Sequence, residues 1–249
     1  MTVKWKTLER SKCISAHSSW NDMLTFKGAI IINKSSQMSK LAWKDIDWTL
    51  VQKRISRQQR RVYKASKEGN RLIVHAIQRR IIRSLDAKLL AVKRVTTENR
   101  GRNKVGVDGV KVFSHEKKIK LISKLNLDGK AKLIRRVYIS RFGTKKIAMP
   151  PLDMITIEDR AKQMLAKIAL EPEWEAKFES NSYGFRPGRS SHDAIAAIFL
   201  SLRGKSRFVL EADLSKCFDE LDNTKILRKL KTFEQMEAQI KSWLQADIM

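Results

Sequence analysis

The stretch RFVLEADLSKCFDELD, residues Arg207–Asp222, decides the fold that this sequence predicts. Apolar and other side chains alternate along its first half, with Phe208 and Leu210 on one side, which is the period-two pattern of a β-strand. Asp213 stands where this strand would end, just before a turn. A carboxylate at the end of a strand is typical of the start of a catalytic metal site. It is also common at ordinary β-to-turn junctions, and these residues alone leave both readings open.

Composition points to a folded protein with a polyanionic partner. The chain has 249 residues, of which 42% are hydrophobic, so we expect one large domain or two small ones with a core. Lys and Arg total 52 against 26 acidic residues, a net charge of +26, which favours nucleic acid over membrane as partner. The sequence has no apolar run of membrane-spanning length, and its first residues include no continuous apolar segment, so we expect no secretion. Its two cysteines lie far apart and its histidines are scattered, which favours a reducing compartment and predicts no Cys/His metal site.

The positive charge is concentrated in the front half of the chain. Residues 53–104 hold 17 Lys or Arg and 3 Asp or Glu, whereas residues 205–249 hold 8 of each. Helical periodicity over Trp43–Glu68 and Arg71–Leu90 predicts two amphipathic helices joined at Gly69 as a hairpin. A merely solvated face is the alternative, but it would carry more acidic partners. We therefore expect phosphate contacts from the arginines of these helices, which are Arg57, Arg60, Arg61, Arg79, Arg80 and Arg83.

The rest of the chain mixes helices, loops and short strands. Residues 1–40 form a loosely ordered leader or a disordered tail. A basic loop over 91–110, ending in a turn at Asp108-Gly109, is followed by a helix within Phe113–Leu127 and a strand within Lys132–Ile139. The basic turn at residues 143–146 belongs either to a hairpin that clamps a polyphosphate or to an ordinary exposed hairpin.

Sequence signals further along place a loop between helices. The TIED run from Thr156 predicts a capping box and a helix that continues to Pro172. The loop at Asn181–Arg189 combines glycine and proline with aromatic and arginine side chains, which suits nucleic-acid contact, with a structural loop as the alternative. Three more helices follow: one capped by Ser191 that runs to Arg203-Gly204, one starting at Asp222 or Asn223, and one around Met236 to Leu244.

Four motifs in order resemble the N-terminal part of group II intron reverse transcriptases and maturases, especially the cyanobacterial and plastid-like kind. They are LEPEWE from Leu170, NSYGFRPGR from Asn181, SHDA from Ser191 and EADLSKCFD from Glu211. The resemblance covers about Trp43 to Trp243. It implies an α+β fold in which a basic helical domain precedes an incomplete fingers/palm of a right-hand polymerase. The expected division is a leader at 1–40, an RNA-binding helical domain at 41–110 and a partial reverse transcriptase domain at 111–249.

The resemblance also implies roles for single residues. Asp213, with the backbone carbonyl of Leu214, matches the metal-binding position of a palm that uses two Mg²⁺ ions. Phe218 matches the aromatic ring beneath the incoming sugar. The triphosphate clamp falls at Arg141 with Lys145 or Lys146. The nucleic-acid contacts expected on the loop are Tyr183, Arg186 and Arg189.

The sequence departs from the family pattern at two places. The run Lys145 to Pro151 does not match the family's clamp segment, and no Asp-Asp pair occurs anywhere in the sequence, although the family's second carboxylate motif is aromatic-x-Asp-Asp. We therefore expect either part of an enzyme that copies RNA into DNA and assists splicing, or a truncated RNA-binding fragment without polymerase activity. The implied partner is intron RNA, with a DNA target or primer and a complementary C-terminal chain as further candidates. A bacterial cytoplasm or a plastid stroma fits, and secretion does not.

Overall fold

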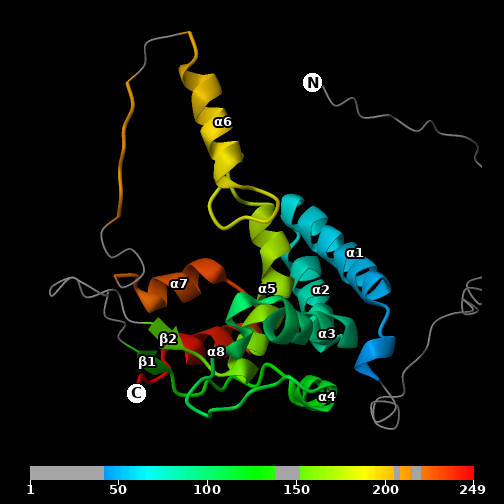
Figure 1. The fold of residues 1–249 in the computed structure, drawn as a ribbon. Helices are drawn as coiled ribbons and strands as arrows, with labels where there is room; N and C mark the ends of the chain where they lie inside the picture. Colours follow the sequence, from blue (N-terminus) through cyan, green and yellow to red (C-terminus); the bar gives the residue numbers. More distant parts are fainter. Residues whose placement is uncertain (1–41, 138–151, 205–207, 215–219) are drawn as a thin grey trace, which may run out of the picture. The chain divides into compact units, whose positions relative to one another are not determined.

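The structure is a computed structural model that describes residues 42–137, 152–204, 208–214 and 220–249. The chain divides into two units, Met1–Lys40 and Leu41–Met249, and the expected leader lies outside the described residues. The described part is mostly helical with a small sheet (Figure 1). Its helices are α1 (Trp48–Lys67), α2 (Arg71–Arg83), α3 (Leu85–Lys93), α4 (His115–Lys124), α5 (Ile157–Glu175), α6 (Ser191–Leu202), α7 (Asn223–Leu230) and α8 (Glu234–Leu244). A five-residue π-helix, called the π-turn below, spans Arg94–Glu98. Short 3-10 helices span Trp43–Asp45 and Arg100–Asn103.

The predicted hairpin of basic helices is confirmed, and its boundaries follow from local capping. The carboxylate of Asp47 accepts a hydrogen bond from Leu50 N at 2.9 Å and begins α1. Gly69, with φ of +71°, reverses the chain after α1, and the Asn70 side chain then caps α2. The single helix predicted over Arg71–Leu90 is wrong, because Ser84 is extended and its hydroxyl caps α3 instead.

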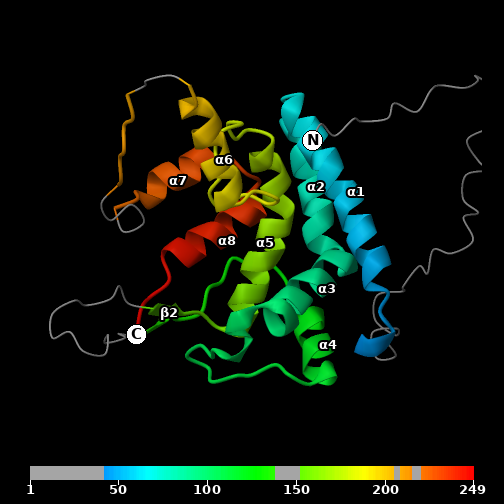
Figure 2. The ribbon, with the colours of Figure 1, turned by 45° about the horizontal axis from the view of Figure 1, so that its top comes forward.

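The core lies where α1, α2 and α3 pack against α5 (Figure 2). Its largest fully buried side chains include Ile55, Val62, Ile81, Leu165 and Ile168. The prediction that α5 ends at Pro172 is wrong, since the helix continues to Glu175. Pro172 has no N–H for the carbonyl of Ile168, four residues earlier. The side chain of Gln59 on α1 donates to that carbonyl at 2.9 Å and replaces the missing bond.

The sheet pairs β1 (Arg135–Val137) with β2 (Leu152–Met154) in antiparallel register, Arg136 opposite Asp153. The Arg136 guanidinium donates twice to the Asp153 carboxylate, at 2.8 and 3.0 Å. On the other edge of β1, the backbone of Ile134 and Arg136 forms hydrogen bonds with the backbone of Asp247 and Met249. The strand predicted within Lys132–Ile139 is thus confirmed, and its pairing joins the middle of the chain to its last residues.

The strand predicted over Arg207–Asp213 is wrong for the residues described there. Residues 208–214 have no regular structure, and Phe208 and Leu210 are almost wholly exposed. A strand forms only when a neighbour satisfies its backbone groups, and the strands within the described residues, β1 and β2, pair with each other. The alternating pattern is therefore present without a partner for it.

Smaller boundaries also differ from those predicted. Thr156 caps α5 as predicted, with its hydroxyl accepting from Asp159 N at 3.2 Å. The cap of α6 is Ser190, which forms a capping box with Asp193, rather than Ser191. Part of the loop predicted over 91–110 is helical, because α3 continues to Lys93 and the segments Arg94–Glu98 and Arg100–Asn103 follow it. Of the helices in the described ranges, none combines the length and apolarity needed to cross a membrane.

Candidate nucleic-acid interface

The outer side of α1 carries three of the arginines that the sequence singled out. Val51, Ile55 and Val62 face the core, so the helical period leaves Arg57, Arg60 and Arg61 on the solvent side, and all three are exposed. Lys64 and Lys67 extend this basic surface along the last turn.

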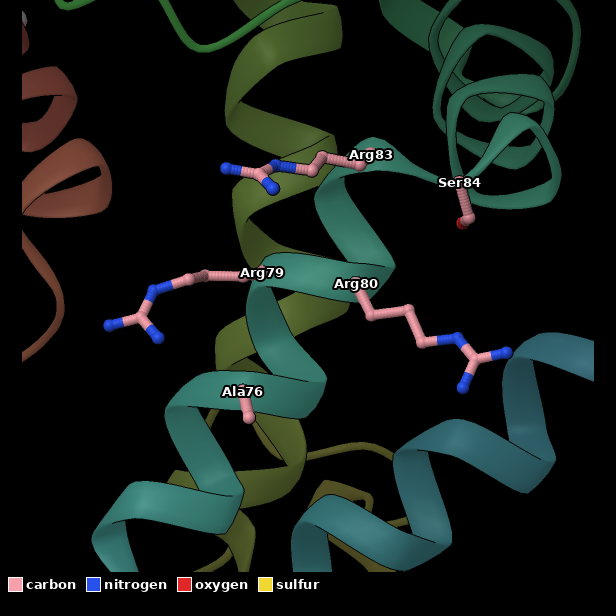
Figure 3. Close-up of a pocket in the computed structure, with 5 residues that line it drawn as sticks. All are labelled: Ala76, Arg79, Arg80, Arg83 and Ser84. Carbon is pink, nitrogen blue, oxygen red and sulfur yellow. The ribbon is translucent and has the colours of Figure 1, made fainter.

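The second set of arginines lies on α2. Arg79, Arg80 and Arg83 are exposed and line an open pocket of about 570 Å³ together with Ala76 and Ser84. Figure 3 shows that Arg79 and Arg83 extend to one side of the helix and Arg80 to the other. The Arg79 guanidinium lies 5.2 Å from the centre of the Phe233 ring, an aromatic contact that leaves its charge uncompensated.

These six arginines, on α1 and α2, are called the arginine surface below. Among the described residues, none of the six has a carboxylate within 4.0 Å. Another arginine of α1, Arg54, does have such a partner, because it lies 3.8 Å from Asp86 on α3. Uncompensated guanidinium groups on an exposed surface are suited to phosphate oxygens, which they bind by paired, charge-assisted hydrogen bonds.

Arg186, expected to contact nucleic acid, points into the protein. It is only 8% exposed, and its guanidinium donates to both oxygens of Glu175 at 3.0 and 2.6 Å. It also donates to the carbonyl oxygens of Glu179 and Ser182. The hydrogen bond from Arg186 holds the pKa of Glu175 below its usual value. Arg186 therefore fastens the loop to the end of α5, and its contact with nucleic acid stays a prediction.

The other predicted loop residues lie nearer the surface. The Arg189 guanidinium lies 5.5 Å from the centre of the Tyr183 ring and donates to the carbonyl of Ser180 at 2.7 Å. Phe185, the second aromatic residue of this loop, is fully exposed at a positive φ of 58°. An exposed ring on the same loop as an arginine-on-tyrosine pair is suited to stacking on unpaired bases.

The carboxylate at Asp213 is not part of a metal site among the described residues. Asp213 and Leu214 are exposed, and a carboxylate oxygen of Asp213 accepts from Leu214 N at 2.9 Å. Within the described ranges, no group of three or more His, Cys, Asp or Glu side chains lies close enough to hold a metal ion. The described residues alone thus form no metal site, and the binding of Mg²⁺ by Asp213 and Leu214 stays a prediction.

Several predicted nucleotide contacts lie outside the described residues. They are Phe218, Arg141, Lys145 and Lys146. Two residues that the sequence did not single out lie close to the loop instead. Tyr63 of α1 and Arg94 of the π-turn line a pocket with Pro187, although they are far apart in the chain. The sequence gives no sign that these residues lie close together, because the pocket is formed by four segments of the chain.

Comparison with known proteins finds two protein families that match successive parts of this chain. Residues 43–125 match the family described as the N-terminal domain of reverse transcriptase. Residues 145–249 match the family described as reverse transcriptase (RNA-dependent DNA polymerase). Together these two matches cover most of the chain.

Similar curated proteins come from bacteria and a euglenid. The group II intron-encoded protein LtrA of Lactococcus lactis subsp. cremoris is 37% identical over 133 residues, covering 52% of this chain and 22% of LtrA. Protein YkfC of Escherichia coli K12 is 32% identical over 153 residues, 57% of this chain and 39% of YkfC. Maturase-like protein 1 of Euglena gracilis is 29% identical over 180 residues, 69% of this chain and 38% of that protein. The chain thus spans less than half the length of these relatives.

Proposed function

We propose that this chain, which belongs to the group II intron-encoded reverse transcriptase and maturase family, binds intron RNA through the arginine surface and so assists splicing. The contact would be to the RNA backbone, because guanidinium groups on a helix surface recognise phosphates without reading bases. Affinity would then come mainly from charge, and the choice of RNA from its shape.

One observation carries this proposal: six arginines of α1 and α2 are exposed and lack a carboxylate partner among the described residues. A basic surface that is merely solvated normally includes acidic neighbours, which reduce the repulsion between its cations. Here the repulsion is left in place, and a polyanion relieves it. The surface lies within residues 43–125, the part that matches the N-terminal domain of reverse transcriptase.

A salt titration tests this proposal. The dissociation constant of the chain for a group II intron RNA is measured by filter binding at several salt concentrations. The variant Arg79→Gln/Arg80→Gln/Arg83→Gln should lower the slope of log affinity against log salt by about 2 to 3, because each lost phosphate contact removes about 0.7 to 0.9. The matched variant with lysine at the same three positions keeps the charge and should keep most of the slope. An unchanged slope in the glutamine variant would contradict the proposal.

The finer fold and site assignments are part of the same proposal. The match over residues 145–249 supports a polymerase fold, and we place the right-hand fingers and start of the palm within residues 111–249 and the RNA-binding domain within residues 41–110. Asp213 and the Leu214 carbonyl would be the palm positions that bind Mg²⁺ in this family. Phe218 would underlie the sugar of a nucleotide.

The triphosphate clamp would be Arg141 with Lys145 or Lys146. Tyr183, Arg186 and Arg189 would lie near the template. A DNA target or primer and a complementary C-terminal chain remain proposed partners, in a bacterial cytoplasm or a plastid stroma.

DNA synthesis is the second candidate function, favoured by the match to RNA-dependent DNA polymerases. We expect no synthesis from the 249-residue chain alone, because the family's second carboxylate motif, aromatic-x-Asp-Asp, does not occur in its sequence. Primer extension on an RNA template in Mg²⁺ checks this. Clear cDNA from the wild-type chain that disappears in Asp213→Asn would show that the chain is itself a polymerase.

A further inference from the structure

A second pocket lies between α1, the π-turn, the end of α5 and the loop that Arg186 fastens. Its volume is about 370 Å³, within the range of small-ligand sites. The lining residues that matter here are Arg60 and Tyr63 from α1, Arg94 from the π-turn, Pro172 from α5 and Pro187 from the loop. In Figures 1 and 2 the end of α1 and the loop after α5 lie side by side. We call this site the Tyr63 pocket.

The charges in the Tyr63 pocket leave two cations uncompensated. Arg94 is half-buried, Arg60 is exposed, and neither has a carboxylate within 4.0 Å among the described residues. Two glutamates also line the pocket, but both are engaged elsewhere. Glu175 receives two hydrogen bonds from Arg186, and Glu171 lies 3.3 Å from Lys167. The pocket is therefore set for an anionic group near Arg60 and Arg94.

Three rings form flat walls of the pocket, beside the polar residues Ser56 and Gln59. Tyr63 is 37% exposed, so part of its ring is open to a ligand, while Lys67 lies 5.4 Å from the ring centre. Pro172 and Pro187 bring two rings from different segments to the same pocket. Neither proline can donate a backbone hydrogen bond, so these walls favour contact with a planar apolar surface. An anion joined to a planar ring describes a nucleotide.

We propose that the Tyr63 pocket holds one unpaired nucleotide of a bound RNA, with its base against the Tyr63 ring and its phosphate on Arg94 and Arg60. This rests on the proposed RNA binding and adds a preference for RNA that has an unpaired base. A base within a duplex is stacked on both sides, so its face cannot reach the ring. The arginine surface holds the backbone of either form, whereas the pocket takes only a base that has left the stack.

The test compares single-stranded RNA with a duplex of the same sequence. The full chain is titrated with a fluorescent RNA of about 12 nucleotides, in both forms, at one fixed salt concentration. Tyr63→Ala should weaken binding of the single strand about tenfold or more, since stacking on one aromatic ring contributes that much. It should leave duplex binding within about twofold. Tyr63→Phe keeps the ring and should bind both forms as the wild type does.

A matched charge variant separates the pocket from general electrostatics. Arg94→Gln should weaken the single strand more than the duplex, whereas Arg83→Gln, on α2 outside the pocket, should weaken both forms by the same factor. Thermal unfolding of each variant shows that it is folded. If Tyr63→Ala and Arg94→Gln affect both forms equally, the pocket proposal is overturned and the arginine surface still stands. If the single-strand effect appears but the triple glutamine variant of α2 keeps its salt slope, the pocket stands and the arginine surface fails.

Discussion

Replacing Gln59 of α1 with leucine should destabilise the protein, because it removes the hydrogen bond to a backbone carbonyl of α5. Pro172 leaves the carbonyl of Ile168 without the partner that every interior helix residue normally has. The Gln59 amide donates to that carbonyl at 2.9 Å, across the packed surface between α1 and α5. Gln59→Leu keeps a side chain of similar size and removes the donor. The partly buried carbonyl is then left without a hydrogen-bond donor from the protein.

The magnitude follows from the cost of an unpaired buried acceptor. A net intramolecular hydrogen bond contributes about 1 kcal/mol, and a carbonyl left unpaired in a core costs about 1 to 3 kcal/mol. Gln59 is half-buried, so leucine recovers part of this by apolar contact, and we expect a loss of about 1 to 2 kcal/mol. For a chain of this size, that loss lowers the melting temperature by about 2 to 8 °C.

A double-mutant cycle isolates the contact. Pro172→Ala restores an N–H at position 172, which can bond the carbonyl of Ile168 within the helix. In that background Gln59→Leu should cost much less, about 0.5 kcal/mol or below, so the coupling energy should be about 1 kcal/mol. Thermal unfolding followed by circular dichroism measures all four proteins. An equal cost of Gln59→Leu in both backgrounds would show that the glutamine does not replace the missing helix bond.

The other predictions concern the loop, a close backbone approach and the exposed helix. Arg186 lowers the pKa of Glu175, so the stability that this pair contributes is complete above about pH 4.3 and is lost as the pH falls through the folded-state pKa. The difference in melting temperature between wild type and Glu175→Gln should therefore shrink from pH 6 towards pH 3. A difference that stays constant over this range would contradict the prediction. Gly106→Ala should destabilise by about 2 kcal/mol or more in urea unfolding, because a Cβ there would lie 2.6 Å from the Thr156 backbone; a neutral effect would refute the close approach. Ile195, Ile198 and Phe199 of α6 are all more than half exposed, so we expect the isolated chain to self-associate through this apolar face. Phe199→Gln should then raise the monomeric fraction in size-exclusion chromatography without changing the melting temperature, and an unchanged elution profile would contradict this.

The features that sequence predicted well are those set by neighbours in the chain. The helix periods of α1 and α2 placed their arginines outside, and the cap at Thr156 and the start of α7 at Asp222 followed from residues three positions apart. Such features depend on local backbone hydrogen bonds and on which side of a helix is apolar. Residues within one or two helical turns are therefore enough to determine them.

The features that sequence missed are set by contacts between distant segments. Arg186 lies in a polar loop, where a charged side chain normally faces water, and only the position of Glu175 at the end of α5 turns it inward. The strand pattern before Asp213 is real as a pattern, but a strand exists only with a partner. Pro172 predicts a helix end in sequence, whereas the donor that allows the helix to continue comes from Gln59, more than a hundred residues earlier.

These long-range contacts meet at the end of α5, and that explains how a basic helix pair and a loop come to share one site. Gln59 satisfies the carbonyl that Pro172 leaves open, so α5 continues far enough for Glu175 to receive Arg186. Arg186 in turn sets the loop beside Tyr63. A helix that stopped at Pro172 would leave Glu175 without a fixed position, and the loop would lose its anchor. Helix continuity at one proline is therefore a condition for the Tyr63 pocket, whose lining includes Gln59 itself.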